Sequence, residues 1–395
     1  MSPGPPIYLD NNSTTPIHPE VVDSMARAWK ELPGNPASQH SVGRKARRVL
    51  EEAREGIVAL LGGKTGGIDA DKLIFTSGGT EANQLAVRGL VEPAATGAEA
   101  RADERLRVMI SAIEHPGVRG AAEALAREGF VVGKLPVQSS GAVNVAELAG
   151  LLSPGTKLVS VMLANHETGV LQPMEEIAKL CSAANIPLHT DAVQAVGKLP
   201  VHFRKLGVTA LTLTPHKFHG PLGIGGLLLR QGARLQPLFQ GGFQQAGLRP
   251  GTECVALVIG FYTALVMADR ELAQRQQRMT ELRTMLEQLL LAGAPDGVLI
   301  GSQSERLPTT TSIAFPGINR QALVMALDMA GVACSTGSAC ASGSSEPSPV
   351  LLAMGLPKEV VEGSIRLSLG AFTTTADVQE GARRILKAVN QLRPA

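Results

Sequence analysis

The chain has 395 residues, a formal net charge of +2, 44% hydrophobic residues and 18% charged residues. This balance is typical of a folded enzyme and excludes a disordered chain, and the length exceeds what one hydrophobic core usually serves. The charge is nearly neutral and no cluster of basic residues alternates with aromatic ones, so nothing indicates nucleic acid or an anionic membrane as a partner.

The first residues and the cysteines bear on location. The N-terminal sequence MSPGPPIYLD has no basic stretch followed by an apolar run, and no other stretch is long and apolar enough to span a bilayer. The four cysteines form no Cys-x-x-Cys pair and have no histidine-rich neighbours, which argues against a zinc site and a disulfide framework. We therefore expect a cytoplasmic protein without a bound metal, whose partners are small molecules and other proteins.

Short aliphatic segments alternate with amphipathic ones from about residue 71 to 230, which predicts a doubly wound, mainly parallel α/β sheet. The predicted strands are residues 72–77, 107–113, 130–135, 157–163, 186–190, 210–214 and 223–229. Ligands bind where the strands of such a sheet end.

A nearly continuous helix is predicted over residues 253–291. After it, the strand-like segments 298–301, 311–315, 332–335 and 364–369 alternate with helices, which predicts a smaller α+β domain. We expect a large domain of residues 15–260 and a small domain made of residues 1–14 and 261–395.

Two neighbouring strand ends carry the residues of a possible cofactor site. Lys217 follows the strand 210–214, where an amine kept partly neutral can form a Schiff base with an aldehyde, although an isolated loop lysine is more often solvated. Asp191 and Gln194 follow the strand 186–190; a carboxylate there can keep a pyridine nitrogen protonated, although such an aspartate is more often a helix cap. Together these residues favour pyridoxal phosphate as the cofactor.

A glycine pair and a helix start follow the strand 72–77. The backbone N–H groups at Gly79 and Thr80, with the Thr80 hydroxyl, can hold a phosphate dianion. An ordinary turn with a threonine N-cap fits the same residues equally well. The chain has neither G-x-G-x-x-G nor a P-loop motif at this place, which disfavours dinucleotide and P-loop sites.

Three further polar residues have two interpretations each. His115, after the strand 107–113, could stack on a cofactor ring and relay protons, or be structural. Asn165, in LANHETG, could be a turn residue or could reach a cofactor oxygen and the substrate. Arg366, inside the segment 364–369, suits a bidentate grip on a substrate carboxylate, with an internal salt bridge as the alternative.

Cys340 lies among small residues in the segment STGSACASGSS. Buried cysteines normally lie among larger aliphatic side chains, so this composition favours an accessible, mobile thiol. Cys334, which follows Val-Ala, is better suited to a place in the core.

On these residues the chain resembles the cysteine desulfurases, a branch of the class-V aminotransferase family with the type I pyridoxal-phosphate fold. The resemblance covers nearly the whole chain, through motifs in the family's order: YLDNNSTTP, GNPASQHSVGRKAR, FTSGGTEANQLA, ANHETGVLQP, HTDAVQAVGK, HKFHGPLGIGGL, LRPGTE and STGSACASG. It implies conversion of L-cysteine to L-alanine with pyridoxal 5'-phosphate, and uptake of the sulfur as an enzyme persulfide.

The resemblance also implies a role for each candidate residue. Lys217 would carry the cofactor, His115 would stack on its ring and relay protons, and Cys340 would be the nucleophile. The other implied contacts are Asp191 to the ring nitrogen, Gln194 and Asn165 to the ring oxygen, Gly79, Thr80, Thr214 and His216 to the phosphate, Thr252 to the phosphate from the other subunit of a homodimer, and Asn165 and Arg366 to the substrate carboxylate.

Two features bear on partners and alternatives. The residues after Cys340 resemble the longer-loop branch of the family, which hands sulfur to an iron–sulfur scaffold protein or another acceptor. The segment GGFQQAGLRPGT departs from the family's usual glycine-rich run around residues 243–246. A selenocysteine lyase, a class-V aminotransferase and a non-catalytic binding module stay open as alternatives.

Overall fold

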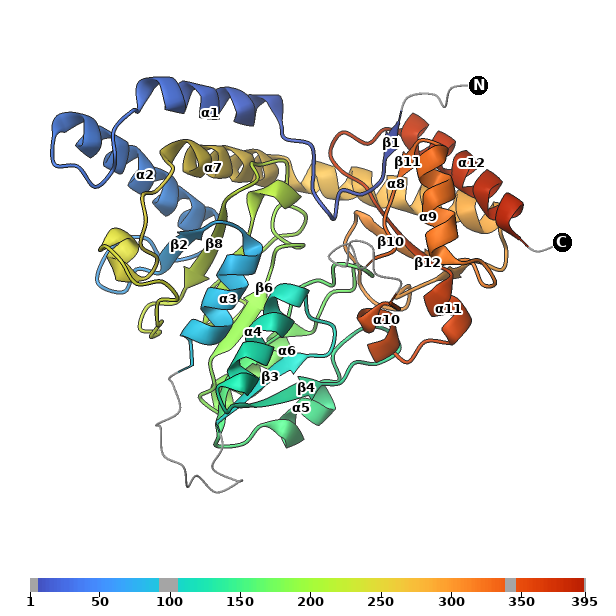
Figure 1. Ribbon diagram of the computed structural model, residues 1–395, viewed down its shortest axis with the longest axis horizontal. Coiled ribbons are helices and arrows are strands. Elements are labelled where there is room, and N and C mark those ends of the chain that lie inside the picture. The colour runs from blue at the N-terminus through green and yellow to red at the C-terminus, as the bar shows by residue number, and fades with distance from the viewer. Residues whose placement is uncertain (1–5, 92–105, 338–345, 394–395) are drawn as a thin grey trace.

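The computed structural model describes residues 6–91, 106–337 and 346–393, so Cys340 lies outside the described residues (Figure 1). The strands within residues 72–229 form one large sheet, and the strands of the C-terminal part form a second group. Helices α7, Val255–Arg270, and α8, Leu272–Gly293, run one after the other from the first group to the second (Figure 1).

The large sheet has seven strands in the order β2-β8-β7-β6-β5-β3-β4. Among them only β8 runs against its neighbours β2 and β7, and the other pairs are parallel. The predicted mainly parallel sheet is therefore confirmed. Its strands are β2 Lys72–Thr76, β3 Arg107–Ser111, β4 Val131–Leu135, β5 Thr156–Ser160, β6 Leu188–Asp191, β7 Ala210–Leu213 and β8 Gly225–Leu229.

Alternate side chains of these strands enter two different hydrophobic cores, because successive strand residues point to opposite faces. In β2, Leu73 and Phe75 belong to the core with α1, α2, α6 and α7, whereas Ile74 packs with α3. The sheet is thus covered by helices on both faces. The helices are α1 Pro19–Glu31, α2 Ser41–Leu60, α3 Gly79–Gly89, α4 Pro116–Arg127, α5 Val145–Leu151 and α6 Met174–Ala183.

The C-terminal group is built on two small sheets. In one, β10 pairs antiparallel with β9 and β12; in the other, the N-terminal β1 pairs parallel with β11. None of the described helices is long and apolar enough to cross a membrane. The elements of this group are β1 Ile7–Tyr8, β9 Val298–Leu299, β10 Thr310–Ala314, α9 Arg320–Met329, β11 Val332–Ala333, α10 Pro349–Ala353, α11 Lys358–Glu362, β12 Ser364–Ser368 and α12 Thr375–Leu392.

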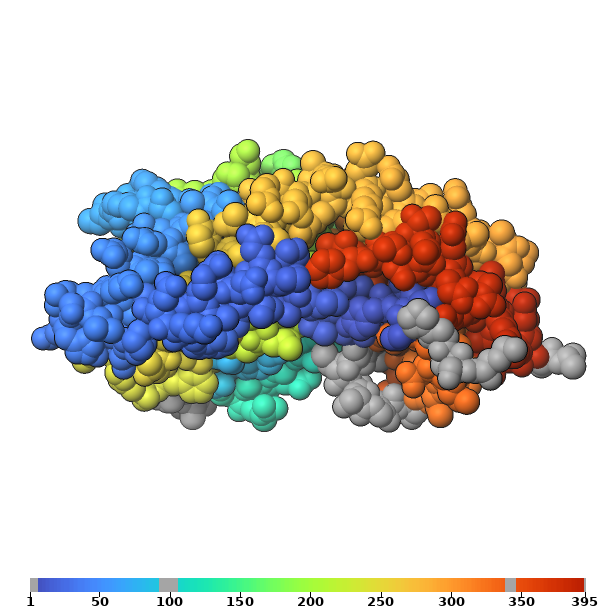
Figure 2. All heavy atoms as spheres, turned by 90° about the horizontal axis from the view of Figure 1, so that it is seen from above, coloured from blue at the N-terminus to red at the C-terminus, as the bar shows by residue number. Residues whose placement is uncertain are grey.

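The first described residues pack with the last ones. Ile7 and Leu9 lie in the same buried cluster as Leu282, Leu323 and Ile385. In the space-filling view the blue N-terminal residues run from the α1 side of the molecule to the red C-terminal elements (Figure 2). The chain therefore enters the large-sheet region only after it has passed through the smaller core.

The helix predicted over residues 253–291 is two helices, which meet at Glu271. The buried residues of α7, up to Ala268, pack in the core of the large sheet, whereas those of α8, from Met279, pack in the smaller core. The division into a domain of residues 15–260 and one of 1–14 plus 261–395 stays a proposal. We propose Glu271 as the better boundary, because residue 260 lies inside α7.

A glycine at the start of β8 gives a test of this packing. A Cβ atom on Gly225 would lie 2.5 Å from the backbone of Gly78, so Gly225→Ala must displace the turn that begins α3. We expect a loss of about 1–3 kcal/mol in the free energy of unfolding, measured by chemical denaturation. Gly150→Ala, in α5 with nothing within 4 Å of the new Cβ, is the matched control and should not destabilise. Equal effects of the two changes would contradict this account.

Candidate active site

A cavity of about 320 Å³ lies at the carboxyl ends of strands of the large sheet, within the size range of cofactor pockets. Residues that follow five different strands line it, and β12 of the smaller core adds Arg366. Its wall consists of Asn12, Ser13, Gly79, Thr80, Asn83, His115, Met162, Ala164, His166, Asp191, Val193, Gln194, Thr214, His216, Lys217 and Arg366. The structure thus brings together every described candidate residue except Asn165 and Thr252.

Lys217 ends the short 3-10 helix that follows β7. Its Nζ donates to the backbone oxygens of Asn12 and Ser13, each at 2.6 Å. These acceptors belong to the N-terminal segment that joins the two cores. The amine is therefore held in the cavity wall and is not a solvated loop lysine.

Asp191 ends β6 and is held from two sides. Its Oδ2 accepts from Asn83 Nδ2 at 2.7 Å, and its Oδ1 accepts from the backbone N–H of Val193 at 3.0 Å. Asn83 is buried on α3, and among the described residues its Oδ1 has no hydrogen-bond partner. Sequence reasoning did not single out Asn83, since an asparagine in the second turn of a helix gives no local signal.

His115 is the N-cap of α4, and its Nδ1 accepts from the backbone N–H of Gly117 at 3.0 Å. Burial lowers the pKa of His115, with the charge of Lys217 adding to the effect and that of Asp191 opposing it. A neutral His115 whose Nδ1 accepts carries its proton on Nε2. His115 is thus structural as a helix cap and also lines the cavity.

His166, next to Asn165, is a cavity residue that the sequence analysis missed. Its ring lies edge-on to that of His115 with centroids 5.5 Å apart, and its Nδ1 is buried without a hydrogen-bond partner among the described residues. Burial and then the charges of His115 and Arg366 hold its pKa well below the ordinary value. Its backbone oxygen accepts from Arg366 Nη1 at 3.0 Å, so the two residues are adjacent.

Asn165 itself is used within its own turn. Its Oδ1 accepts from the backbone N–H groups of Glu167 and Thr168, each at 2.9 Å, and its Nδ2 donates to the backbone oxygen of Ile113 at 3.2 Å. Asn165 is fully buried and is not part of the cavity wall. The turn interpretation of this residue therefore describes the structure.

Arg366 forms the internal salt bridge that was one of its two alternatives. Its Nη2 donates to Asp10 Oδ1 at 2.7 Å and to Ser13 Oγ at 2.8 Å, which is the internal ion pair. The residue is only 2% exposed yet lines the cavity, and its Nε has no hydrogen-bond partner among the described residues. A buried guanidinium with a spare donor can bind an anion in the cavity.

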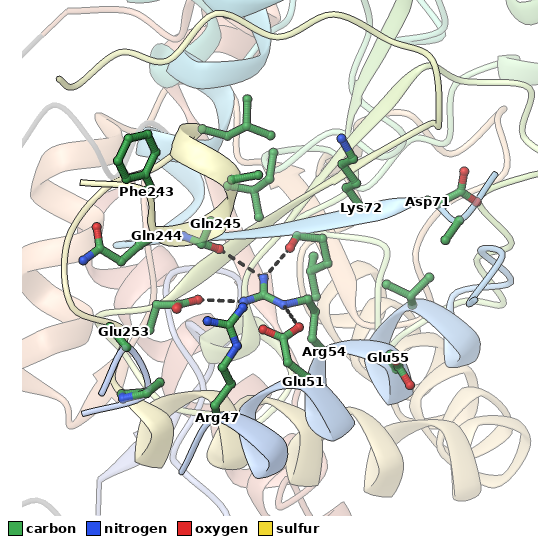
Figure 3. Close-up of a pocket in the computed structure, with 18 of the residues that line it drawn as sticks. Arg47, Glu51, Arg54, Glu55, Asp71, Lys72, Phe243, Gln244, Gln245 and Glu253 are labelled. Atoms are coloured by element: carbon green, nitrogen blue, oxygen red, sulfur yellow. Dashed lines mark hydrogen bonds and ion pairs between the residues drawn. The ribbon is translucent and has the colours of Figure 1, made fainter. Parts of the chain in front are cut away.

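Thr252 lies elsewhere, in a larger cavity of about 600 Å³ (Figure 3). The centre of that cavity is Arg54, whose Nη2 donates to Glu253 at 2.6 Å and whose Nη1 donates to Gln245 Oε1 at 3.1 Å. In its wall Arg54 also pairs with Glu51, and of the candidate residues that the structure describes this wall holds Thr252 alone. We therefore take the smaller cavity as the active site, and Thr252 is not part of it within one chain.

The residues present fit pyridoxal 5'-phosphate. Gly78, the N-cap of α3, has no side chain to occupy the first N–H groups of the helix, and a Cβ on Gly79 would lie 3.2 Å from Val193. An anion can thus approach this helix start closely. Burial, together with Lys217 and Lys198, lowers the pKa of His216 to about 3, so this imidazole is a neutral donor or acceptor.

The described thiols differ in their surroundings. Burial raises the pKa values of Cys181 and Cys334 to about 12, which keeps both thiols protonated at neutral pH. Cys334 packs against the smaller core, as the sequence suggested. Cys254 is exposed at the start of α7.

Comparison with known proteins agrees with this geometry. Residues 7–380 match the family described as Aminotransferase class-V. The chain is 40% identical over 387 residues to the cysteine desulfurase NifS of Azotobacter vinelandii, with 98% of this chain and 93% of that one covered. It is 39% identical over 387 residues to the cysteine desulfurase IscS of Dictyoglomus turgidum, with 98% and 95% covered. A solved structure of a NifS-like protein matches with a TM-score of 0.87 at 32% identity, covering 98% of this chain and all of that one (100%).

The fold and the lysine-aspartate cavity define a pyridoxal-phosphate enzyme of the type I fold, and the chain belongs to the class-V aminotransferase family. Within that family it is a cysteine desulfurase, a sulfurtransferase that depends on pyridoxal 5'-phosphate.

The buried carboxyl next to His115 gives a pH test of the site. Burial raises the pKa of Glu114 to about 8, although Ser111 Oγ and the Met162 N–H donate to its Oε1. Between the ordinary pKa and about 8 the folded state holds a proton that the unfolded state releases, so stability falls as the pH rises through this window.

We expect Glu114→Gln to flatten this fall. The melting temperature of the variant, measured by calorimetry at about pH 5.5 and about pH 8, should fall less between the two pH values than that of the wild type. In unfolding free energy, the difference between the two proteins amounts to up to about 1.4 kcal/mol per pH unit. Glu123→Gln, on the exposed side of α4, is the control and should follow the wild type. Parallel curves for all three proteins would show that Glu114 does not titrate in this window.

Proposed function

We propose that this cysteine desulfurase binds L-cysteine in the 320 Å³ cavity and passes its sulfur to Cys340. The observation that carries the proposal is the meeting of Lys217, Asp191, His115 and Arg366 around one cavity at the carboxyl edge of the sheet. Each supplies a different function that the reaction requires: an amine, an acid partner for a pyridine nitrogen, a proton relay and a carboxylate anchor.

Pyridoxal 5'-phosphate, when bound, supplies an electron sink for the carbanion formed from the amino acid. Asp191, held by Asn83 and Val193, is placed to keep the pyridine nitrogen protonated. The phosphate ligands would be the helix start at Gly79 and Thr80, with Thr214 and His216. The Thr214 hydroxyl donates to the backbone oxygen of Ile224 at 2.9 Å. Its proton is thus already used, so Thr214 would contact a phosphate without donating a hydrogen bond to it.

Lys217 and His115 divide the proton transfers. Lys217 Nζ removes the α-proton of the substrate, since it lies in the cavity wall, where it donates to the carbonyls of Asn12 and Ser13. His115, whose Nδ1 is used by the α4 cap, exchanges its proton at Nε2. Its lowered pKa keeps the ring neutral at physiological pH, the state in which it can stack and relay.

The substrate carboxylate is bound, we propose, by Arg366 with His166 beside it. Arg366 Nε and His166 Nδ1 are both buried without partners among the described residues, and both residues line the cavity. Asn165, the earlier candidate for contacts to the ring oxygen and the carboxylate, supports this site indirectly by fixing the turn that presents His166.

Cys340 is proposed as the nucleophile on the basis of its sequence surroundings. Its thiolate sulfur forms a bond with the substrate sulfur while the carbon–sulfur bond of the substrate breaks, and the electron pair stays on carbon until protonation gives alanine. The persulfide on Cys340 then goes to an acceptor, an iron–sulfur scaffold protein or another sulfur carrier. The three cysteines within the described ranges are free thiols, which suits a reducing compartment, and we propose the cytoplasm.

The activity is tested with two variants of the holoenzyme. Cys340→Ala should keep the visible absorption of the bound cofactor but lose alanine and sulfide formation from L-cysteine by about three orders of magnitude or more. Lys217→Ala should lose both the borohydride-sensitive absorption and the activity. Cysteine desulfuration at the wild-type rate by Cys340→Ala would refute the role of this thiol.

Competing substrates separate the alternatives in the same assay. A much higher kcat/KM for selenocysteine than for cysteine would indicate a selenocysteine lyase, and amine transfer dependent on a keto acid would indicate an aminotransferase.

We also propose a homodimer in which Thr252 reaches the cofactor phosphate of the other subunit. The segment that leads to Thr252 carries Phe243, which is 95% exposed, and Phe239, which is 52% exposed. Large exposed apolar side chains close together in sequence indicate an interface. Thr252 lies outside the cavity of its own chain, so only another chain could bring it there.

A mixed dimer tests this arrangement. Lys217→Ala and Thr252→Val, each expected to be impaired, are coexpressed with different tags and the heterodimer is isolated. If Thr252 acts in the other subunit's site, one of the two sites is intact and about half of the wild-type turnover per dimer returns. No gain over the separate variants would place Thr252 in its own site or in neither.

A further inference from the structure

A second lysine is buried behind the cavity. Lys198 lies four residues after Gln194, in the segment that follows β6, and is only 8% exposed. Its Nζ donates to Gln194 Oε1 at 2.7 Å and to Asn12 Oδ1 at 3.1 Å. Among the described residues no carboxylate forms an ion pair with it, and nothing in the proposed reaction uses this amine directly.

The contact between Lys198 and Gln194 fixes the orientation of an amide. Lys198 Nζ donates to the side-chain oxygen of Gln194, so this oxygen faces the lysine. The amide nitrogen then faces the other way, where Nε2 donates to the backbone oxygen of Asn12 at 2.9 Å. Since Gln194 lines the cavity, its remaining N–H, which has no acceptor among the described residues, is the group it can offer to a ligand.

Asn12 joins this pair to the cofactor lysine. Its backbone oxygen accepts from both Gln194 Nε2 and Lys217 Nζ, while its side-chain oxygen accepts from Lys198. Its Nδ2 donates to Thr310 Oγ1 of β10 at 2.9 Å. Lys198, Gln194 and Lys217 therefore belong to one hydrogen-bond network anchored on a single N-terminal residue.

We propose that Lys198 is a positioning residue, which orients Gln194 so that an N–H faces the ring oxygen of the cofactor and which places a second basic group beside Lys217. The proposal rests on the proposed function, since it assigns a role toward the cofactor of the same site. It concerns a residue that does not line the cavity and so does not touch the substrate.

The direction of the effect follows from electrostatics. An N–H that donates to an anionic ring oxygen, and a positive charge nearby, both disfavour a proton on the nitrogen of Lys217 when it is linked to the cofactor. Burial lowers the pKa of Lys198 itself, followed by repulsion from Lys217 and Arg366. The other charged and titratable groups around this network are His115, His166, Asp191, His216, His219 and Asp10 with Arg366.

The test is a pH titration of the visible absorption of the resting holoenzyme, without substrate. Lys198→Met should raise the midpoint of the absorption change by about one pH unit or more, because the variant loses both the hydrogen bond that orients Gln194 and the basic group beside Lys217. Lys198→Gln, neutral but still polar, should shift it in the same direction. Lys179→Met, which removes an exposed lysine paired with Glu175, is the control and should leave the midpoint unchanged.

A second comparison separates orientation from charge. Gln194→Leu should raise the midpoint on its own, and adding Lys198→Met to it should then shift the midpoint by less than Lys198→Met does in the wild type. A lower melting temperature with an unchanged midpoint, in either Lys198 variant that folds, would overturn the proposal. Failure of the proposed function would differ, since the wild type itself would then show no borohydride-sensitive band.

Discussion

Buried basic side chains are concentrated in and behind the wall of the cavity, and this constraint shapes the rest of the site. Lys217 and Arg366 line the cavity and Lys198 lies behind it, while Asp191 and Asp10, the partner of Arg366, bring negative charge. An isolated charge is costly to bury. Buried basic side chains therefore have lowered pKa values, donate hydrogen bonds to dipoles or bind an anion. The backbone carbonyls of the N-terminal segment supply the dipoles, and the phosphate group of pyridoxal 5'-phosphate would supply the anion.

The same constraint explains why the histidines of the site are neutral. The pKa values of His115, His166 and His216 are all lowered, in each case by burial first and then by neighbouring positive charge. A neutral imidazole can stack on a ring and can both accept and donate a hydrogen bond. The positive charge of an imidazolium would be repelled by the nearby lysines. Burial, reinforced by the neighbouring positive charge, thus favours the protonation state that the proposed relay needs.

Much of this could be predicted from the sequence, because strand ends are easy to locate and the residues after them must meet at one edge. Lys217, Asp191 and His115 were found this way. The distinction between Asn165 and His166 could not be made, since neighbouring residues in a tight turn point in opposite directions and only the folded backbone shows which one faces the cavity. Asn12 was missed because it belongs to a segment without strand or helix, whose role arises from contacts with Thr310 and Lys217 far along the chain.

The thiols illustrate how packing limits the chemistry. A nucleophile must reach the thiolate state near neutral pH, and burial prevents this in Cys181 and Cys334, whose pKa values are raised to about 12. Cys254 is exposed, but it begins α7 and does not line the cavity. Burial therefore excludes Cys181 and Cys334 as the nucleophile. The place of Cys254 outside the cavity excludes it as well within one chain. Cys340, which the sequence surrounds with small residues, is the thiol that is left, so the packing of the three described thiols supports its proposed role as the nucleophile.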